Sequence, residues 1–524
     1  MRGVDKTSRW LVLVSGVLQV LVFPAPGLSW LCWIALAPLI IMILSGGSLD
    51  GAPPGSGPRP VPLRAGFLAG YASGVLWYLG SCYWIFHVMH SYGGLAAPVA
   101  AGVLVLFCLY LGLYHGLFGF LLAWTAGGER PGRALLLAPF LWVAVELARA
   151  RITGFPWDLL GTAQVDNVGL TRLATITGVY GVSLEIAMVN AAFAAVLVVP
   201  RTRRLPTLIA ALVVSTLLQG GKLVQPAPAP ADRTATLVQL DLPILEGGEW
   251  TSEYLDRTLA DLARLSTPQV PAGERKPELI IWPESPAPFF ATDPRFRRAL
   301  SNLAQSAGSY VLAGSLGGAP TGDLLYNSAE LIAPNGDWAG RYNKVHLVPW
   351  GEYVPFPRLF AFAQKLTHEV GDFSRGSERH PLNLGAYRAG VFICYESVFP
   401  DEIRQFAAAG AGVFVNISND GWFGESGAPG QHLNMARMRA IENRRWLLRT
   451  TNTGITAAID PYGRVVARAP RNQRVVLQAP YAALSEQTFY TRHGDWFAWA
   501  CAIISLAGLI LSFRPNGLSP WSKN

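Results

Sequence analysis

Long apolar stretches fill both ends of the chain and leave a long middle region without them. A transmembrane helix needs about 20 consecutive, predominantly apolar residues. Such stretches lie near residues 10–24, 29–46, 66–86, 96–124, 134–150, 173–199, 205–221 and 495–513. The pattern predicts a polytopic α-helical protein with about eight transmembrane helices: about seven in a domain over 1–225 and one over 494–514. Residues 233–490 would form a domain outside the membrane.

The composition agrees with this class, since 15% charged residues is far below the roughly 25% of soluble domains. The first stretch is short and follows Arg2, Lys6 and Arg9, which is also the pattern of a cleaved signal peptide. Further apolar stretches follow it at once. They favour a retained helix over a signal peptide.

Basic residues in the short loops predict the orientation, because they accumulate on the cytoplasmic side. In an eight-helix arrangement one side carries Arg2, Lys6, Arg9, Arg59, Arg64, Arg130, Arg133, Arg201, Arg203, Arg204, Arg514 and Lys523. The short loops of the other side carry only Arg149, Arg151 and Arg172. Both termini are therefore predicted to be cytoplasmic, with 233–490 outside. Topology thus explains the formal charge of +8 better than nucleic acid, for which no clustered basic and aromatic face is visible.

Residues 233–490 alternate β-rich runs with helix-like segments, which predicts an α/β layered domain. Strands are expected at Thr234–Leu242, Leu279–Pro283, Tyr310–Ser315, Tyr326–Ile332, Gly390–Tyr395, Val413–Ser418 and Gly454–Ile459. Helices are expected at Ser252–Leu265, Arg295–Ser306 and Asp401–Ala409. Asn335-Gly336 and Pro461-Tyr462-Gly463 indicate turns, and the proline-rich Pro226–Ala231 indicates a linker that leaves the membrane.

Cys394 is the only cysteine outside the predicted transmembrane stretches, which contain Cys32, Cys82, Cys108 and Cys501. No C-x-x-C pair occurs, so neither a disulfide framework nor a zinc framework is implied. A single thiol in an oxidising compartment has no partner in its own domain and is free for chemistry. The alternative is a buried core cysteine, and spacing alone leaves both interpretations open.

Two further runs supply groups that complement a nucleophilic thiol. Trp282-Pro283-Glu284-Ser285 offers a carboxylate, and Tyr342-Asn343-Lys344 offers an amine. Together with Cys394 they would build a Glu/Lys/Cys catalytic site. The alternative for Glu284 and Lys344 is a surface ion pair.

The order of these runs, with Cys394-Tyr395-Glu396 last, resembles the nitrilase (carbon–nitrogen hydrolase) superfamily. Within it, four segments are similar to bacterial apolipoprotein N-acyltransferases: Gly154–Trp157, Tyr342–Pro355, Ser418–Gly424 and Gln431–Ala440. The match covers nearly the whole chain, including the eight-helix layout. It implies that 233–490 forms a nitrilase-like αββα sandwich.

The resemblance implies a multi-pass enzyme of the bacterial inner membrane whose catalytic domain faces the periplasm. Such an enzyme takes a fatty acyl group from a phospholipid, typically phosphatidylethanolamine. It places this group on the α-amino group of the N-terminal diacylglyceryl-cysteine of apolipoproteins, the last step of lipoprotein maturation. Ping-pong chemistry through a thioester on Cys394 is implied. No cofactor is implied, and a monomer is expected.

By the same resemblance, Glu284 is the general base that deprotonates the thiol, whose reference pKa is about 8.5. Lys344 would hold positive charge beside the developing oxyanion and favour the thiolate. Glu352 would support the lysine. The alternative for Glu352 is an exposed loop acid.

Other residues are expected around this centre. Tyr395 and Glu396 would shape the pocket beside the nucleophile, although packing is the alternative for Tyr395. Trp250 matches a tryptophan that lines the acyl pocket in the family. Trp422 and Phe423, bracketed by glycines, suit a mobile loop that inserts aromatic rings into the lipid interface; core packing is the alternative.

Two polar residues receive structural interpretations. Glu185 lies within a predicted transmembrane helix, an expensive position that suggests function, but a structural hydrogen bond to a neighbouring helix is favoured. His432 has no second ligand at metal spacing, so no metal is expected.

Two other functions remain open at this stage. A membrane-tethered amidase or nitrile hydrolase would use the same Glu/Lys/Cys set with water as acceptor, but it does not need so large a membrane part. A transporter or receptor whose outer domain only binds ligand would leave Cys394 replaceable. Few charges lie within the predicted transmembrane helices, which argues against an ion pathway.

Overall fold

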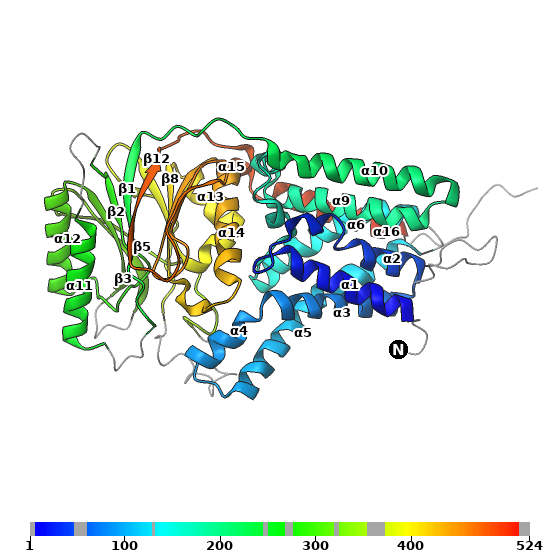
Figure 1. Ribbon diagram of the computed structural model, residues 1–524, viewed down its shortest axis with the longest axis horizontal. Helices are drawn as coiled ribbons and strands as arrows, with labels where there is room; N and C mark the ends of the chain where they lie inside the picture. Colours follow the sequence, from blue (N-terminus) through cyan, green and yellow to red (C-terminus); the bar gives the residue numbers. More distant parts are fainter. Residues whose placement is uncertain are drawn as a thin grey trace, which may run out of the picture.

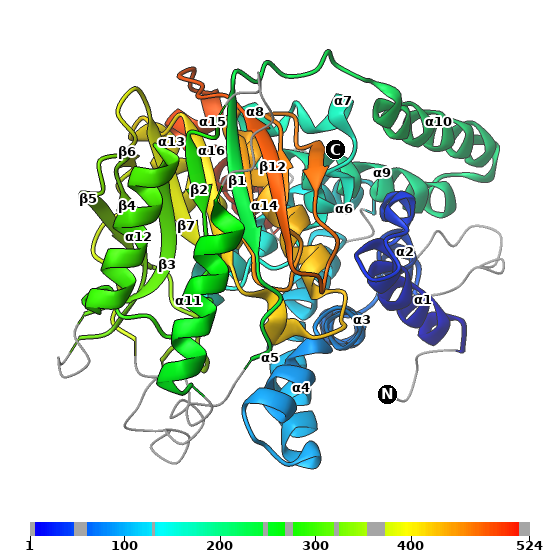
Figure 2. The same cartoon turned by 60° about the vertical axis from the view of Figure 1, so that its left-hand side comes forward.

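The computed structural model describes residues 6–46, 60–127, 131–244, 250–267, 276–318, 324–353 and 373–512. Two six-stranded sheets lie face to face in the middle of the chain (Figures 1 and 2). The first has the order β12-β1-β2-β3-β4-β5 and the second β11-β10-β9-β8-β7-β6. β1, β2 and β3 are parallel to one another, as are β7, β8 and β9.

The strands of the first sheet are β1 (Arg233–Gln239), β2 (Leu279–Ile281), β3 (Tyr310–Gly317), β4 (Tyr326–Ile332), β5 (Trp338–Asn343) and β12 (Val475–Tyr481). Those of the second are β6 (Leu382–Asn383), β7 (Arg388–Ile393), β8 (Val413–Ser418), β9 (Trp446–Thr451), β10 (Ala457–Ile459) and β11 (Val465–Arg468). Helices α11 (Ser252–Ser266) and α12 (Pro294–Ala307) cover the first sheet. Helices α13 (Pro400–Ala408) and α14 (Ala428–Asn443) cover the second. The result is an αββα sandwich, called the sandwich below.

All seven expected strands and all three expected helices occur, but their ends differ by a few residues. β5, β6, β9, β11 and β12 had no counterpart in the expectations. Asn335-Gly336 turns the chain between β4 and β5, where Gly336 adopts a φ of 87° that glycine tolerates. β9 was missed because half of its residues, Arg449, Thr450 and Thr451, are polar although all six are buried.

The other described helices form a second body, called the helical part below, at one end of the sandwich (Figure 1). They are α1 (Lys6–Val22), α2 (Ala37–Ser45), α3 (Leu63–Ser81), α4 (Trp84–His87), α5 (Ala97–Thr125), α6 (Pro131–Ala148), α7 (Val168–Thr171), α8 (Ala174–Thr177), α9 (Val179–Val198), α10 (Arg201–Gln219), α15 (Phe489–His493) and α16 (Trp496–Ser512). Short 3-10 or π turns connect several of them: η1 (Ser29–Trp33), η2 (Val88–Tyr92), η3 (Arg149–Thr153), η4 (Leu160–Gln164) and η5 (Gly220–Leu223).

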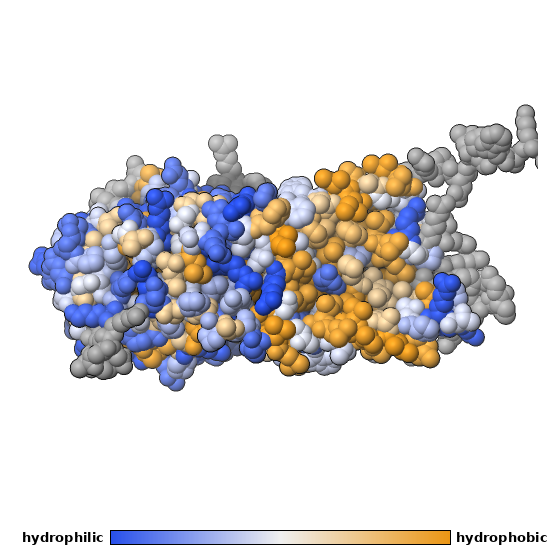
Figure 3. Space-filling model, turned by 90° about the horizontal axis from the view of Figure 1, so that it is seen from above, coloured by the Kyte–Doolittle hydropathy of each residue, from blue (hydrophilic) through white to orange (hydrophobic). Residues whose placement is uncertain are grey.

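Three of the described helices are long and apolar enough to cross a membrane: Ala97–Thr125, Val179–Leu197 and Arg201–Leu223. Shorter apolar helices lie at Thr7–Val22, Ser29–Ser45 and Trp496–Ser512. A helix therefore lies at each of the eight predicted positions, but eight membrane crossings are not established. On the face seen in Figure 3, apolar residues predominate over the helical part, whereas polar residues predominate over the sandwich.

Close packing of α3 against α5 depends on glycines spaced four residues apart. A Cβ atom on Gly70 would lie 2.1 Å from the carbonyl oxygen of His115, and one on Gly119 would lie 2.2 Å from that of Gly66. Neither position leaves room for a side chain. The two backbones can therefore approach directly.

Glu185 does not have the expected partner. It is half-buried on α9, and no hydrogen-bond or ion-pair partner for it is found within the ranges given above. The expectation of a hydrogen bond to a neighbouring helix was therefore wrong: among the described residues, no donor of a neighbouring helix reaches the carboxylate.

α14 joins the two bodies, because it lies between the second sheet and the helical part (Figure 1). Leu433, Ala436 and Ala440 belong to the core of the sandwich, and Met435 and Met438 to that of the helical part. All residues of α14 except Gly430 and Asn434 are buried, including the polar ones. The sequence Gln431–Ala440 therefore forms the buried joint of the molecule.

Candidate active site

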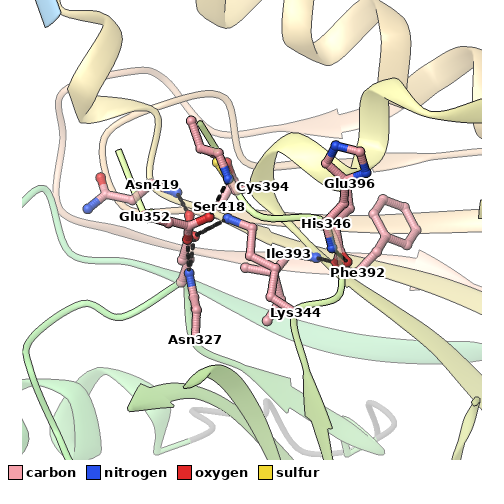
Figure 4. A network of polar contacts seen from close by, with 12 residues as sticks. Asn327, Lys344, His346, Glu352, Phe392, Ile393, Cys394, Glu396, Ser418 and Asn419 are labelled. Carbon is pink, nitrogen blue, oxygen red and sulfur yellow. Dashed lines mark hydrogen bonds and ion pairs between the residues drawn. The ribbon is translucent and has the colours of Figure 1, made fainter. Parts of the chain in front are cut away.

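Glu284, Lys344 and Cys394 come together where strands of both sheets end. Glu284 follows β2, Lys344 follows β5 and Cys394 follows β7. The side chain of Lys344 points toward Cys394 in Figure 4. All three are buried, with exposed fractions of 6%, 1% and 8%, so Glu284 and Lys344 do not form a surface ion pair.

Cys394 lies on a strained turn between β7 and the short helix Cys394–Val398. Its φ of 51° is in the left-handed region, which is uncommon for residues other than glycine. Ser285, next to Glu284, has a φ of 30°. Such strain is characteristic of functional sites, where the surrounding structure holds an unfavourable backbone in place.

Two carboxylates hold the Lys344 ammonium. Its Nζ lies 2.9 Å from Oε1 of Glu352 and 3.3 Å from Oε1 of Glu284. Burial by itself would lower the pKa of Lys344, but Glu352 and Glu284 outweigh burial and raise this pKa above its usual value. Lys344 therefore remains a cation at neutral pH.

Neutral donors fix both carboxylates in place. Nδ2 of Asn327 donates to Oε1 of Glu284 and to Oε1 of Glu352, at 2.8 Å in each case. The backbone N–H of Asn419 donates to the other oxygen of Glu284 at 2.8 Å, and that of Val348 donates to Glu352 at 2.8 Å. Asn327 was absent from the expectations, since one asparagine in a strand gives no motif.

The Cys394 thiol is protonated in the resting site. Burial raises its pKa, the negative charge of Glu284 raises it further, and Lys344 and the Ser418 hydroxyl oppose this effect. A buried thiol with a raised pKa needs a base to become a nucleophile. Glu284, whose charge acts directly on the thiol, is the candidate for this base.

Glu396 connects the two segments that carry Lys344 and Cys394 (Figure 4). Its Oε1 accepts from the backbone N–H of Val345 at 2.8 Å and of His346 at 3.1 Å. Its Oε2 accepts from the N–H of Ile393 at 2.8 Å. All of these contacts are with backbone beside the site. Glu396 thus positions the lysine and the cysteine relative to each other.

A second buried network holds the backbone of the nucleophile. Nε2 of His432 lies 3.1 Å from the carbonyl oxygen of Cys394, and Nδ1 lies 3.0 Å from both Oδ1 of Asp420 and Nη2 of Arg449. A carbonyl oxygen only accepts, so the network assigns a proton to Nε2. Burial and the Arg449 guanidinium lower the pKa of His432, which keeps the ring neutral.

Asp420 and Arg449 form the charged part of this network. Nη2 of Arg449 lies 2.8 Å from Oδ2 of Asp420, with both side chains fully buried. Burial would raise the pKa of Asp420, but the Arg449 guanidinium lowers it below its usual range. Asp420 was expected only as part of a motif, and Arg449 was missed within β9.

No group of side chains suited to a metal ion is found among the described residues.

A loop of the helical part, Gly154–Trp157, contacts the residues around Cys394 from the side opposite the sheets. The hydroxyl of Tyr395 donates to the carbonyl oxygen of Gly154 at 2.9 Å, and Nε1 of Trp157 donates to Oε1 of Gln431 at 2.8 Å. The Trp157 ring stacks on His432 with 5.9 Å between centroids. The Gly154–Trp157 loop therefore contacts Tyr395, which follows Cys394 in the chain, and His432, which lies against the Cys394 carbonyl group.

The two loop aromatics contact the helical part. Phe423 lies edge-on to Trp84, with 5.0 Å between ring centroids, and Trp422 lies edge-on to Tyr92 at 5.2 Å. Both rings are half-buried.

Trp250 lies elsewhere. It packs against the core between the first sheet and α11, beside Tyr254, and none of its described contacts is with Glu284, Lys344 or Cys394.

Comparisons with known proteins cover both bodies. A family model described as "Carbon-nitrogen hydrolase" matches residues 223–487, and one described as "Apolipoprotein N-acyltransferase N-terminal domain" matches 15–192. A Geobacter metallireducens protein described as "Apolipoprotein N-acyltransferase" is 38% identical over 98% of this chain and 97% of its own length. A Methylococcus capsulatus protein with the same description is 36% identical over 79% of this chain and 81% of its own length. The solved structure of Saccharomyces cerevisiae Nit3, described as a nitrilase-superfamily member, aligns with 48% of this chain and 89% of its own at 20% identity, with a TM-score of 0.37.

Proposed function

Since the chain belongs to the apolipoprotein N-acyltransferase family, it is an acyltransferase enzyme, and we propose that it uses a phospholipid, typically phosphatidylethanolamine, as its acyl donor. The acceptor is an apolipoprotein, specifically the α-amino group of its N-terminal diacylglyceryl-cysteine. The reaction completes lipoprotein maturation. One observation carries the proposed mechanism: a buried cation, Lys344, lies between two buried carboxylates beside a strained, buried cysteine.

In the first half-reaction, Glu284 takes the proton of the Cys394 thiol. The thiolate attacks the carbonyl carbon of a fatty acyl ester, and the negative charge that develops on the carbonyl oxygen faces Lys344. Removal of one such stabilising donor in other enzymes costs about 3–4 kcal/mol of transition-state stabilisation. The ester C–O bond then breaks, Glu284 returns the proton to the leaving oxygen, and a lysophospholipid departs from the Cys394 thioester.

In the second half-reaction, the α-amine of the diacylated cysteine attacks the thioester carbonyl. The C–S bond breaks and an amide forms. The proton lost by the amine passes through Glu284 to the thiolate of Cys394, which restores the resting enzyme. Glu352 and Asn327 act by positioning: they hold Lys344 and Glu284 through both half-reactions.

The enzyme belongs to the bacterial inner membrane. We place eight crossings in residues 1–225 and 494–514, both termini in the cytoplasm and the catalytic domain, 233–490, outside. The exposed apolar residues of α10 and α16 support this placement, since soluble surfaces rarely expose such continuous patches. Trp422 and Phe423 would lie at the entrance from the lipid. The enzyme would act as a monomer without a cofactor.

A carbon–nitrogen hydrolase with water as acceptor is less well supported. The relatives match the helical part as well as the sandwich, and hydrolysis of a soluble substrate needs no such part.

The decisive experiment is the intact mass of the detergent-purified protein after incubation with phosphatidylethanolamine alone. We expect one fatty acyl adduct, which a diacylglyceryl peptide discharges as an N-acylated product. Cys394→Ala should form no adduct, whereas Cys108→Ala, which removes a buried thiol from α5, should react normally. An adduct on Cys394→Ala, or none on the wild type with several phospholipids, would contradict the mechanism.

A further inference from the structure

Three arginines lie in short loops on the predicted outer side, where basic residues are few. Two of them have structural partners. Nη1 of Arg149 donates to the carbonyl oxygen of Trp157 at 2.7 Å, and Arg151 lies 2.6 Å from a carboxylate oxygen of Asp495. Arg172 is exposed at the end of α7, and its side chain has no hydrogen-bond or ion-pair partner among the residues that the structure describes. Its position needs another explanation.

Arg172 lies at a groove of about 420 Å³ between α7, α8 and the end of α10. In Figure 2, α7 lies between α8 and α10. The walls are apolar: Leu170, Leu173, Ile176, Leu217 and Leu218. A Cβ atom on Gly169 would lie 2.9 Å from Cα of Gly221, so two glycines in contact close one end of the groove. Leu217 is 72% exposed, so the groove opens outward.

A second arginine approaches from the sandwich. Arg444 ends α14, and its guanidinium lies 4.7 Å from the centre of the Tyr462 ring. Burial lowers the pKa of Arg444 and the Arg172 guanidinium lowers it further, whereas Tyr462 and Asp460 oppose this effect. The two cations therefore repel each other. Within the described parts of the chain, no carboxylate pairs with either.

The neighbouring carboxylates already have partners. Asp166 lies 2.5 Å from Arg437, and Asp460 lies 2.6 Å from Arg464. Lys222, one residue beyond the groove lining, adds another positive charge and donates to Ser29. Arg172 therefore places a positive charge in the lining of an otherwise apolar groove, and Lys222 and Arg444 add positive charge near it.

We propose that this groove binds an anionic phospholipid, with one acyl chain along the apolar walls and the phosphate between Arg172 and Arg444. A lipid is favoured over a soluble anion because the groove is continuous with the exposed apolar face of α10, which includes Leu212 and Val213. The half-exposed Trp496, which donates from Nε1 to the carbonyl oxygen of Ile176, marks the interfacial level where tryptophan is common.

A net negative head group is favoured over a zwitterionic one. The ammonium of phosphatidylethanolamine would be repelled by the same two arginines that attract its phosphate. The bound lipid would connect α7 of the helical part to α14 of the sandwich. This site contains no nucleophile and is separate from Cys394, so the inference does not depend on the proposed acyl transfer.

The test is native mass spectrometry of the full chain carrying Cys394→Ala, titrated with phosphatidylglycerol or with phosphatidylethanolamine. The Cys394 background prevents consumption of the lipid. We expect one high-affinity phosphatidylglycerol site with at least tenfold preference over phosphatidylethanolamine. Arg172→Ala and Arg444→Asn should each weaken phosphatidylglycerol binding at least tenfold and remove the preference; asparagine suits the left-handed φ of 51° at position 444.

Two further variants separate the groove from general charge effects. Leu217→Trp should fill the groove and also weaken binding tenfold while both arginines remain. Arg203→Ala removes an exposed arginine from the opposite end of α10 and should leave binding unchanged. Equal affinity for both lipids in the wild type, or tight phosphatidylglycerol binding by both arginine variants, would overturn the proposal. So would an equal loss in Arg203→Ala.

Discussion

The active site has two unlike sides. On the sandwich side, charged groups are buried and bind one another and backbone amides: Lys344 with Glu284 and Glu352. On the side of the helical part, neutral groups dominate, with single hydrogen bonds from Tyr395 and Trp157 and stacked aromatic rings. The difference separates two tasks. In the proposed mechanism, the sandwich supplies the reacting charges, and the helical part orients the turn that carries Cys394.

The energies of these contacts differ accordingly. Removal of one partner from a buried charge pair costs about 3–5 kcal/mol, because the remaining charge is left unpaired. A neutral hydrogen bond contributes only about 0.5–1.5 kcal/mol. Substitutions on the sandwich side should therefore have the larger effects on stability and activity.

Lys344→Met tests the charged side most severely. It leaves Glu284 and Glu352 buried near each other without a cation, so we expect about 3–5 kcal/mol of destabilisation. Acyl transfer should fall by about 100-fold or more. Thermal unfolding in detergent and single-turnover acylation measure the two effects. Lys276→Met, at an exposed position of the sandwich, is the control. Activity within tenfold of the wild type would contradict the role of Lys344.

Substitutions of Asn327 test whether a neutral donor on the sandwich side contributes to stability and activity. Asn327→Leu removes one donor from each carboxylate, which should cost about 1–3 kcal/mol. Asn327→Asp has nearly the same shape but adds a negative charge, so its loss of kcat should be greater than that of the leucine variant. Steady-state kinetics of both variants give the comparison. A smaller loss for the aspartate variant would show that packing, not charge, governs this position.

His432, on α14 between the two sides, should make the stability of the protein depend on pH. Its pKa is lowered in the folded protein, whereas the unfolded chain binds a proton below about pH 6.5. Stability should therefore fall as the pH decreases from 6.5 to 5, by at most about 1.4 kcal/mol per pH unit. His432→Gln should reduce this slope in unfolding experiments at pH 7 and pH 5. An unchanged slope in His432→Gln would refute the assignment.

The smallest effect is expected on the side of the helical part. Tyr395→Phe removes the hydrogen bond to Gly154 and should cost about 0.5–1.5 kcal/mol, with less than a tenfold loss of acyl transfer. Tyr387→Phe removes a hydroxyl contact with Tyr481 inside the sandwich and should leave transfer unchanged. A transfer rate for Tyr395→Phe as low as that of Lys344→Met would erase the distinction between the two sides.

Much of the fold was visible in short runs of sequence, because amphipathic periods and apolar stretches are local properties. The expected helices at Ser252–Leu265 and Arg295–Ser306 coincide closely with α11 and α12. β9 was not visible, since its buried Arg449 breaks the apolar pattern and becomes stable only beside Asp420. Membrane crossing was only partly testable, because several of the helices are too short or too polar by composition alone.

The sequence by itself determined the class of the protein, its family resemblance and the three reacting residues that we propose, since each depends on residue types in a fixed order. Tertiary structure decided what surrounds them. Asn327 reaches two carboxylates, Trp157 stacks on His432 across 275 positions, and the charge of Arg172 acts on Arg444 because α14 packs against α8. Contacts between distant segments depend on how the two sheets and the helices pack, and no local pattern encodes that packing.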